Sequence, residues 1–237
     1  MSHTSDRVEF PSNGDTAGGY LAVPESGAGP GVIVVQEWWG LDSGIVEIAD
    51  RLAAEGFTAL APDLYRGELA GHTEMDKAGE LMTAMPPDRA ARDMSGAVDY
   101  LVASDHVTGT GPDKKVGVVG FCMGGMLSFF LAANRPDRVA AVVPFYGFPQ
   151  GDGQPDYSAI TAPIRAHLAE HDDFFGPEAA RELEARLKEL GLDVEFTVYP
   201  GSGHAFMAPH NALGTQDLDL YAQVWPKVTE FLHQQLG

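Results

Sequence analysis

Short apolar runs alternate with segments of helical periodicity along most of the chain. Residues 32–35 form an uninterrupted apolar run between a glycine and a polar pair, which is typical of a strand buried on both faces of a parallel sheet. Similar runs predict further strands over 57–61, 115–119, 139–144, 164–169 and 194–199. Apolar residues three and four positions apart predict helices over 73–84, 87–102, 123–133, 177–190 and 217–236.

Two further segments complete the predicted fold. Residues 7–10 and 19–23 alternate weakly around Asn13-Gly14, which predicts an antiparallel hairpin. A helix follows the first apolar strand, with Asp42 or Ser43 as its N-cap and Gly56 at its end. Strands that alternate with helices predict an α/β fold, a doubly wound and mostly parallel sheet with helices on both faces. No repeat or Pro/Ser-rich linker divides the chain, so we expect a single domain over residues 1–237.

The charge balance narrows the classes of partner. The chain carries a formal net charge of −19 and no Lys/Arg-rich run, so we expect neither nucleic-acid nor anionic-lipid binding. Glycine, proline or charge interrupts every apolar stretch before it reaches the roughly 18 residues of a membrane span. The single cysteine and the absence of a signal peptide at the start of the sequence predict a cytoplasmic protein. We expect a monomer or a weak homo-oligomer.

Reactive side chains follow four of the predicted strands. In open α/β sheets the ligand lies outside the carboxyl ends of the strands, and these ends carry Glu37, Cys122, Asp172 and His204. Cys122 stands in Gly-Phe-Cys-Met-Gly between a strand and a helix, which fits the G-x-S-x-G nucleophile elbow with cysteine in place of serine. The alternative is an unreactive core cysteine; a redox sensor is less favoured because the chain has no second cysteine. We expect the N-terminus of the following helix to favour the thiolate of Cys122.

A base and an orienting acid follow in the chain order of an α/β-hydrolase. His204 lies in a glycine-rich segment that we expect to form a mobile loop, and a solvated surface histidine is the alternative. Asp172 follows the strand before the histidine-bearing one, and spacing alone leaves Asp173 as a second candidate for the acid. A metal site at His167 and His171 is disfavoured, because no third ligand is in register with them.

The assembled motifs resemble the dienelactone hydrolase family, an α/β-hydrolase branch with a Cys-His-Asp triad. The resemblance covers nearly the whole chain and rests on QEWWG at 36–40, APDLY at 61–65, GFCMGG at 120–125, FYG at 145–147, residues 167–174 and GHAF at 203–206. It implies Cys122 as the nucleophile, His204 as the base and Asp172, rather than Asp173, as the acid.

The resemblance also implies roles around the triad. Glu37 is expected to contact the resting thiol and to move when substrate binds, while the backbone N–H groups of Trp38 and Met123 form the oxyanion hole. We expect the substrate pocket to be lined by Trp39, Tyr146 and Phe206.

The implied activity is hydrolysis of a small ester or lactone through an acyl-enzyme, without a metal or cofactor. Family members that open chlorinated dienelactones hold the substrate carboxylate with arginines; one of these positions is Ala208 here, and Lys77 is the only basic residue in the segment expected to hold the other. We therefore expect neutral substrates to be preferred. The alternatives are a thioesterase or another acyl-transfer enzyme, and a catalytically silent ligand-binding protein.

Overall fold

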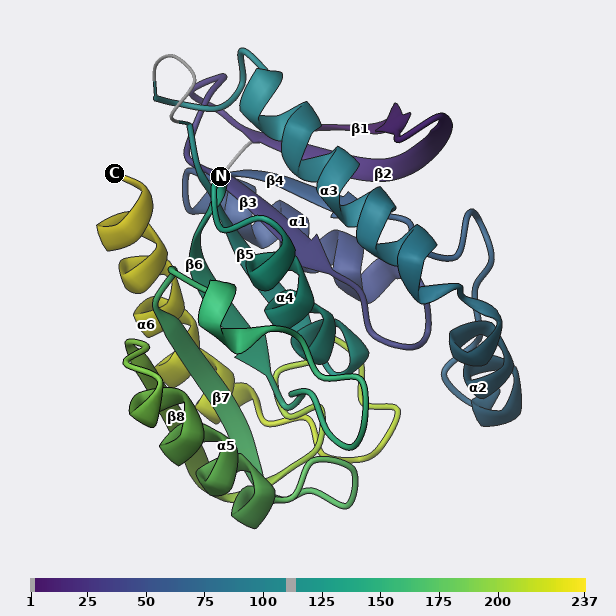
Figure 1. Ribbon diagram of the computed structural model, residues 1–237. Helices are drawn as coiled ribbons and strands as arrows, with labels where there is room; N and C mark the ends of the chain where they lie inside the picture. The colour runs from purple at the N-terminus through teal and green to yellow at the C-terminus, as the bar shows by residue number, and fades with distance from the viewer. Residues whose placement is uncertain (1–2, 110–113) are drawn as a thin grey trace.

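An eight-stranded sheet forms the centre of the computed structural model, which describes residues 3–109 and 114–237 (Figure 1). The strand order is β1-β2-β4-β3-β5-β6-β7-β8. Of the described strands only β2 runs in the opposite direction to the others, so its pairs with β1 and β4 are antiparallel and all remaining pairs are parallel. The strands are β1 (His3–Ser12), β2 (Asp15–Pro24), β3 (Gly31–Val35), β4 (Thr58–Pro62), β5 (Val116–Phe121), β6 (Val139–Phe145), β7 (Ile164–His171) and β8 (Val194–Gly203). The predicted mostly parallel α/β sheet is confirmed.

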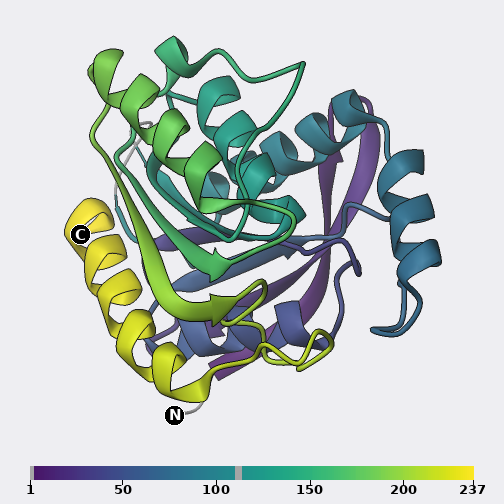
Figure 2. The ribbon, with the colours of Figure 1, turned by 90° about the horizontal axis from the view of Figure 1, so that it is seen from below.

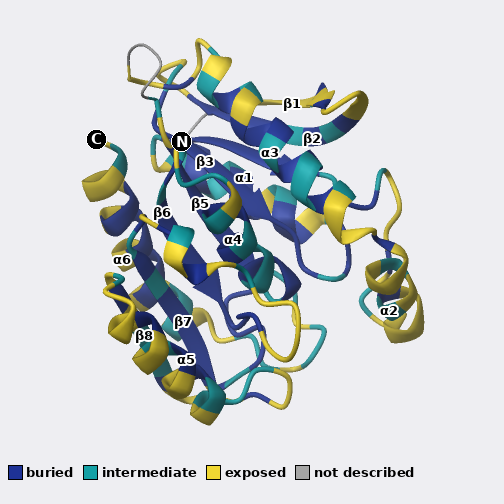
Figure 3. Ribbon diagram, viewed as in Figure 1, coloured by how far each residue is buried: buried dark blue, intermediate teal, exposed yellow. Residues whose placement is uncertain are grey.

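Helices cover both faces of this sheet. Figure 2 shows α1 (Ser43–Ala54) and α6 (Leu218–Leu236) on one face and α3 (Pro87–Ala103), α4 (Met123–Asn134) and α5 (Pro177–Glu189) on the other. Each strand residue faces one layer or the other, so Val116 and Val118 pack with α3 and α4, while Val119 and Phe121 pack with α1 and α6. Two apolar cores result, and buried residues fill the whole centre of the fold (Figure 3).

Two shorter helices complete the described part of the fold. The helix α2 (Met75–Ala84) stands beside the sheet and not on it, as Figure 1 shows, and buries Ala78 against Trp39. The 3₁₀ helix η2 (Tyr157–Ala159) was not predicted from the sequence. Within residues 3–109 and 114–237, no helix combines the length and apolar character needed to cross a lipid bilayer.

The predicted elements are present, and their ends shift for local reasons. Asp42, not Ser43, is the N-cap of α1, because its Oδ1 accepts the Ile45 N–H at 3.0 Å. The hairpin turn at Asn13-Gly14 has φ angles of 44° and 92°, as a type I′ turn requires. The paired strands on either side extend well beyond the alternating residues, since every residue from His3 to Ser12 has a partner in β2.

The glycine-rich segment before His204 corrects one expectation. It is the last part of strand β8 rather than a mobile loop, and Gly203 pairs with His171 of β7. Ser202 donates a hydrogen bond to the Tyr199 carbonyl at 2.7 Å, which fixes the bend that the glycines permit. His204 therefore follows an ordered strand directly.

Candidate active site

Five neighbouring strands deliver five functional side chains to one edge of the sheet. The strands β3, β5, β6, β7 and β8 are consecutive in the sheet, and each is followed within two residues by a reactive or polar side chain. These side chains are Glu37, Cys122, Tyr146, Asp172 and His204, and all but the partly exposed Cys122 are buried. The carboxyl ends of parallel strands lie at one edge, so the fold itself brings these groups together.

The backbone at Cys122 has the strained geometry of a nucleophile elbow. Cys122 has φ 53° and ψ −116°, a conformation that L-residues rarely adopt. A Cβ atom on Gly120 would lie 2.0 Å from the carbonyl oxygen of Gly124, and one on Gly124 would lie 2.2 Å from the carbonyl oxygen of Val35. Both positions flanking the cysteine therefore require glycine, as the motif predicts.

The imidazole of His204 is held by Asp172. The His204 Nδ1 atom lies 2.8 Å from Asp172 Oδ2 in a buried hydrogen bond, which leaves Nε2 as the nitrogen available for chemistry. The other carboxylate oxygen of Asp172 accepts the backbone N–H groups of Phe174 and Phe175, each at 2.9 Å. Asp173 is exposed, so the structure brings Asp172 to the histidine and leaves its neighbour outside the pair.

Aromatic rings fix the plane of the His204 ring. The Phe175 ring stacks on it with centroids 5.9 Å apart and an interplanar angle of 15°. The Tyr146 ring meets it edge-on at 5.0 Å, and the Phe174 ring lies at 4.9 Å. These contacts restrict the imidazole to one orientation, and no pattern in the sequence indicates this role for the two phenylalanines.

The electrostatic environment favours a neutral thiol at Cys122. Burial raises the pKa of the thiol, and the negative charges of Glu37 and Asp172 raise it further. The backbone N–H groups of Met123 and Trp38 act in the opposite direction, but they do not outweigh burial. The N–H groups at the start of the helix thus favour negative charge on the sulfur, as expected, but burial and the two carboxylates act against it more strongly, so the pKa of the thiol is raised.

A cavity of about 540 Å³ opens onto the sulfur and the imidazole. Met82 and Phe174, at 41% and 51% exposure, stand at its outer part. Its wall is formed by Trp38, Met82, Cys122, Met123, Met126, Phe148, Gln150, Asp173, Phe174, Phe175, His204 and Leu213. This wall is mostly apolar and aromatic, and Asp173 is its one charged residue apart from the histidine.

Three residues expected in the pocket wall lie deeper in the protein. Tyr146 and Phe206 are fully buried behind the site, and their rings are 5.6 Å apart. Trp39 is 2% exposed and packs on Ala78 of α2. The wall of the cavity consists of other residues, so these three side chains support the site from the core.

The two positions considered for a clamp on a substrate carboxylate also lie away from the cavity wall. Ala208 is 2% exposed in the core between the sheet and helices α1 and α6. Lys77 is exposed on α2 and does not contribute to the wall. Neither position supplies a positive charge to the cavity.

Sequence reasoning missed the partner of Glu37. The Glu37 Oε2 atom lies 2.7 Å from His210 Nε2, with the two side chains only 6% and 10% exposed. Burial lowers the pKa of His210, but its hydrogen bond to Glu37 and the charges of Glu37 and Asp42 outweigh this effect, so the pKa is raised. The pair is 173 positions apart in the chain, and no local pattern connects them.

The sheet order, the elbow and the acid–histidine pair together define an α/β-hydrolase. The chain matches the family model of the Dienelactone hydrolase family over residues 17–236. It therefore belongs to that family, and the prediction of a carboxylic ester hydrolase is confirmed at the level of the family.

Similar proteins agree with this assignment. "Protein usf" of Aquifex pyrophilus is 45% identical over 203 residues, which cover 84% of this chain and 86% of that protein. A protein of Aquifex aeolicus (strain VF5) named "Putative carboxymethylenebutenolidase" is 42% identical with the same coverage. The crystal structure of a dienelactone hydrolase-like promiscuous phosphotriesterase from metagenomic libraries covers the whole of both chains with a TM-score of 0.82 at 24% identity, which shows the shared fold.

Proposed function

We propose that this protein hydrolyses small esters or lactones through an acyl-enzyme on Cys122, with His204 as the base and Asp172 as the residue that orients it. One observation carries the proposal. The strained cysteine and the histidine line the same cavity, and the histidine is hydrogen-bonded to a buried carboxylate. A nucleophile, a base and an orienting acid are the parts that covalent acyl transfer requires.

Acylation begins with removal of the thiol proton. His204 Nε2 takes the proton as the sulfur attacks the substrate carbonyl, and Asp172 stabilises the imidazolium that forms. The backbone N–H groups of Trp38 and Met123, which favour negative charge at the sulfur, are placed to stabilise the oxyanion. The imidazolium then returns the proton to the departing alcohol or ring oxygen, and a thioester remains on Cys122.

Deacylation repeats these steps with water. His204 removes a proton from the water as its oxygen attacks the thioester carbonyl, and the tetrahedral intermediate then expels the sulfur. The carboxylic acid product leaves and the thiol regains its proton. Every step uses groups of the chain and one water molecule.

Glu37 controls when the sulfur becomes reactive. Its charge raises the pKa of the Cys122 thiol in the substrate-free protein, which keeps the nucleophile protonated and protects it from oxidation. A substrate that displaces this carboxylate removes that charge from the sulfur and makes the transfer to His204 easier. The family resemblance assigns the same movement to this glutamate.

The cavity favours uncharged substrates. Its lining contains no lysine or arginine among the described residues, and Asp173 contributes a negative charge. One charge-assisted hydrogen bond is worth roughly 1.5–3 kcal/mol, so a missing clamp weakens binding of a carboxylate-bearing substrate by about tenfold to a hundredfold. Neutral aryl esters and lactones lose nothing by this absence.

The test is to trap the acyl group. We expect a p-nitrophenyl ester to give turnover, and a rapidly quenched reaction to show the acyl mass on the peptide that contains Cys122. Cys122→Ala abolishes both signals. Ser128→Ala is the matched control, because Ser128 is a small buried nucleophile in the same helix whose hydroxyl only donates to the Gly125 carbonyl at 2.6 Å.

Two results would contradict the proposal. Turnover that survives in a folded Cys122→Ala protein would exclude the cysteine as the nucleophile. An acyl mass found on any other peptide would place the covalent chemistry elsewhere.

A further inference from the structure

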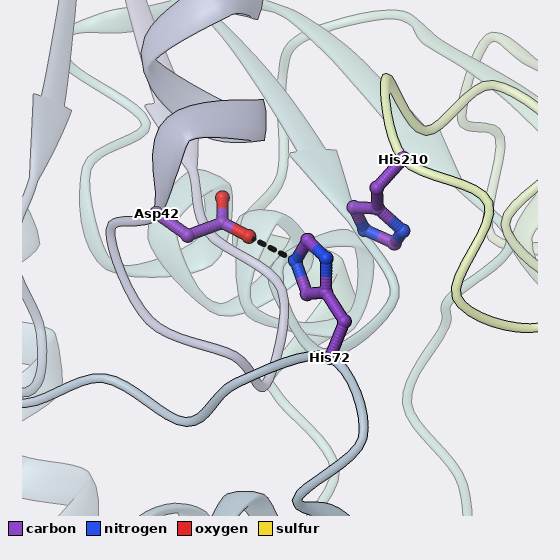
Figure 4. A group of neighbouring side chains, drawn as sticks. All are labelled: Asp42, His72 and His210. Atoms are coloured by element: carbon purple, nitrogen blue, oxygen red, sulfur yellow. Dashed lines mark hydrogen bonds and ion pairs between the residues drawn. The ribbon is translucent and has the colours of Figure 1, made fainter.

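Three potential metal ligands meet beside the candidate active site (Figure 4). Asp42 is the N-cap of α1, His72 lies in the turn before α2, and His210 lies between β8 and α6. One ligand atom of each residue lies within 4.8 Å of those of the other two. We propose that Asp42, His72 and His210 bind Zn²⁺ or a similar divalent transition-metal ion.

The donor atoms select the class of metal. Two imidazoles and one carboxylate suit zinc and its neighbours in the first transition row, whereas calcium and magnesium prefer oxygen ligands throughout. Ligand bonds of about 2.1 Å in a tetrahedral site place donor atoms about 3.4 Å apart. The most distant donors therefore have to approach by up to about 1.4 Å, whereas Asp42 Oδ2 and His72 Nε2, which are 2.6 Å apart, have to separate by about 0.8 Å. His72 can supply this movement, because it stands in a turn and its side chain is 31% exposed.

The carboxylate of Asp42 is already oriented for binding. Its Oδ1 atom accepts the backbone N–H of Ile45 at 3.0 Å, which fixes the group at the start of α1. Its Oδ2 atom lies 2.6 Å from His72 Nε2, and Figure 4 shows this contact with the His210 ring on the far side of His72. The carboxylate is therefore already ordered in the folded protein, so binding of the metal ion does not have to order it.

The two histidine rings lie against each other and against Trp39. Their centroids are 4.0 Å apart, and the Trp39 ring contacts both edge-on, at 5.4 Å from His72 and 6.5 Å from His210. Three segments that are distant in the chain therefore converge on one point with their donors side by side.

The surroundings balance the charge of a divalent cation. Asp42 contributes one negative charge as a ligand, and Glu37, hydrogen-bonded to His210 at 2.7 Å, contributes a second in the next layer. Carboxylates that contact a ligating histidine commonly orient it and strengthen its binding. The carboxylates of Asp42 and Glu37 and two neutral imidazoles match a charge of +2, and the fourth coordination position is left to water.

The three ligands lie next to the proposed catalytic machinery and share one neighbour with it, Glu37, which contacts His210. None of the three ligands lines the cavity that contains Cys122 and His204. Ion binding can therefore be measured whether or not the proposed reaction is correct.

The experiment measures ion binding by the full chain. The protein is stripped with a chelator, and Zn²⁺ is then titrated by calorimetry at neutral pH, with Co²⁺ as a spectroscopic substitute. We expect one ion per chain and the intense visible absorption of four-coordinate Co²⁺. Since loss of a group beyond the ligands already costs about 10- to 100-fold in affinity, His72→Ala and His210→Ala should each weaken binding by at least about 100-fold.

Two controls separate this site from other ligands in the chain. His3→Ala removes a histidine that lies 2.9 Å from Asp50 but has only that one carboxylate partner, and it should leave affinity unchanged. Cys122→Ala should also leave affinity unchanged. Absence of binding by the wild-type protein would overturn the proposal, as would binding that persists in His72→Ala or is lost in Cys122→Ala. Because His72 is in a partly exposed turn, its variant tests the site without disturbing the core.

Discussion

Replacing Asp172 with asparagine should move one proton of the proposed triad, the ring proton of His204, and leave the backbone hydrogen bonds to residue 172 in place. The Oδ1 atom of Asp172 accepts two backbone N–H groups, from Phe174 and Phe175, at 2.9 Å each. An asparagine must keep its amide oxygen there, because its NH₂ group would otherwise face two donors. The NH₂ group then points to His204 Nδ1, which the aspartate oxygen contacts at 2.8 Å.

This arrangement forces the wrong tautomer on the histidine. With an N–H donor facing it, Nδ1 has to be the acceptor, so the ring proton moves to Nε2 and the base can no longer take a proton from Cys122. Loss of the correct tautomer lowers kcat by about 10²- to 10⁴-fold in enzymes of this type, or about 2.7–5.5 kcal/mol in the barrier. Both backbone hydrogen bonds survive, so the fold should be retained.

The assay compares Asp172→Asn with Asp173→Asn on a neutral aryl ester. The neighbouring carboxylate is exposed and makes the matched control, since its replacement removes the same charge one residue away. We expect kcat to fall only in the first variant, with far-UV circular dichroism unchanged in both. Equal losses at the two positions, or a loss of less than about fivefold at Asp172, would refute the assignment of the acid.

Two further predictions concern stability. Burial and the nearby charge of Lys227 lower the pKa of His167 to about 3, so below about pH 6.5 the unfolded chain binds a proton at this residue that the folded chain does not bind. The free energy of unfolding should therefore have its full value above that pH and fall by up to about 1.4 kcal/mol per pH unit towards pH 3. In urea titrations at several pH values, His167→Gln should reduce this slope. Gly124→Ala places a Cβ atom 2.2 Å from the Val35 carbonyl oxygen and should lower the melting temperature sharply or prevent folding. The control Gly79→Ala, at a position in α2 with no atom within 4 Å of the added Cβ, should raise the free energy of unfolding by up to about 1 kcal/mol. Equal melting temperatures for the two variants would contradict the elbow geometry.

The sequence predicts the catalytic edge of this fold because the signals there are local. A buried strand, a glycine-flanked cysteine and a helical pattern follow one another within twenty residues around Cys122. The order of Cys122, Asp172 and His204 along the chain then follows from the order of the strands, because each residue stands directly after one of them. The choice of Asp172 over Asp173 does not follow from these patterns, since spacing leaves both open and the family resemblance is needed to choose between them.

Contacts between segments that are distant in the chain cannot be predicted from local sequence patterns. The turn at His72 and the loop at His210 carry no periodicity that relates them to Asp42, yet their donor atoms converge within 4.8 Å. The prediction of the pocket residues fails for a similar reason. Trp39 and Phe206 are as aromatic as Phe174, and only the packing of α2 and α6 decides which rings are buried. The direction of the thiol pKa also depends on burial, which the helix N-terminus alone does not reveal.

The strands and the segments outside the sheet contribute different parts of the candidate site. The groups proposed for chemistry follow rigid strands of the sheet, and glycine contacts of about 2 Å leave the elbow no freedom to vary. The outer wall of the cavity comes from three separate segments, represented by Met82 on α2, Phe174 after β7 and Leu213 before α6. Met82 and Leu213 lie outside the sheet, so substitutions there can change the size and charge of the cavity, whereas Phe174 packs against the His204 ring and its replacement also affects that residue. The proposed selectivity for neutral substrates therefore depends on segments outside the sheet, while the groups proposed for the catalytic steps follow its strands.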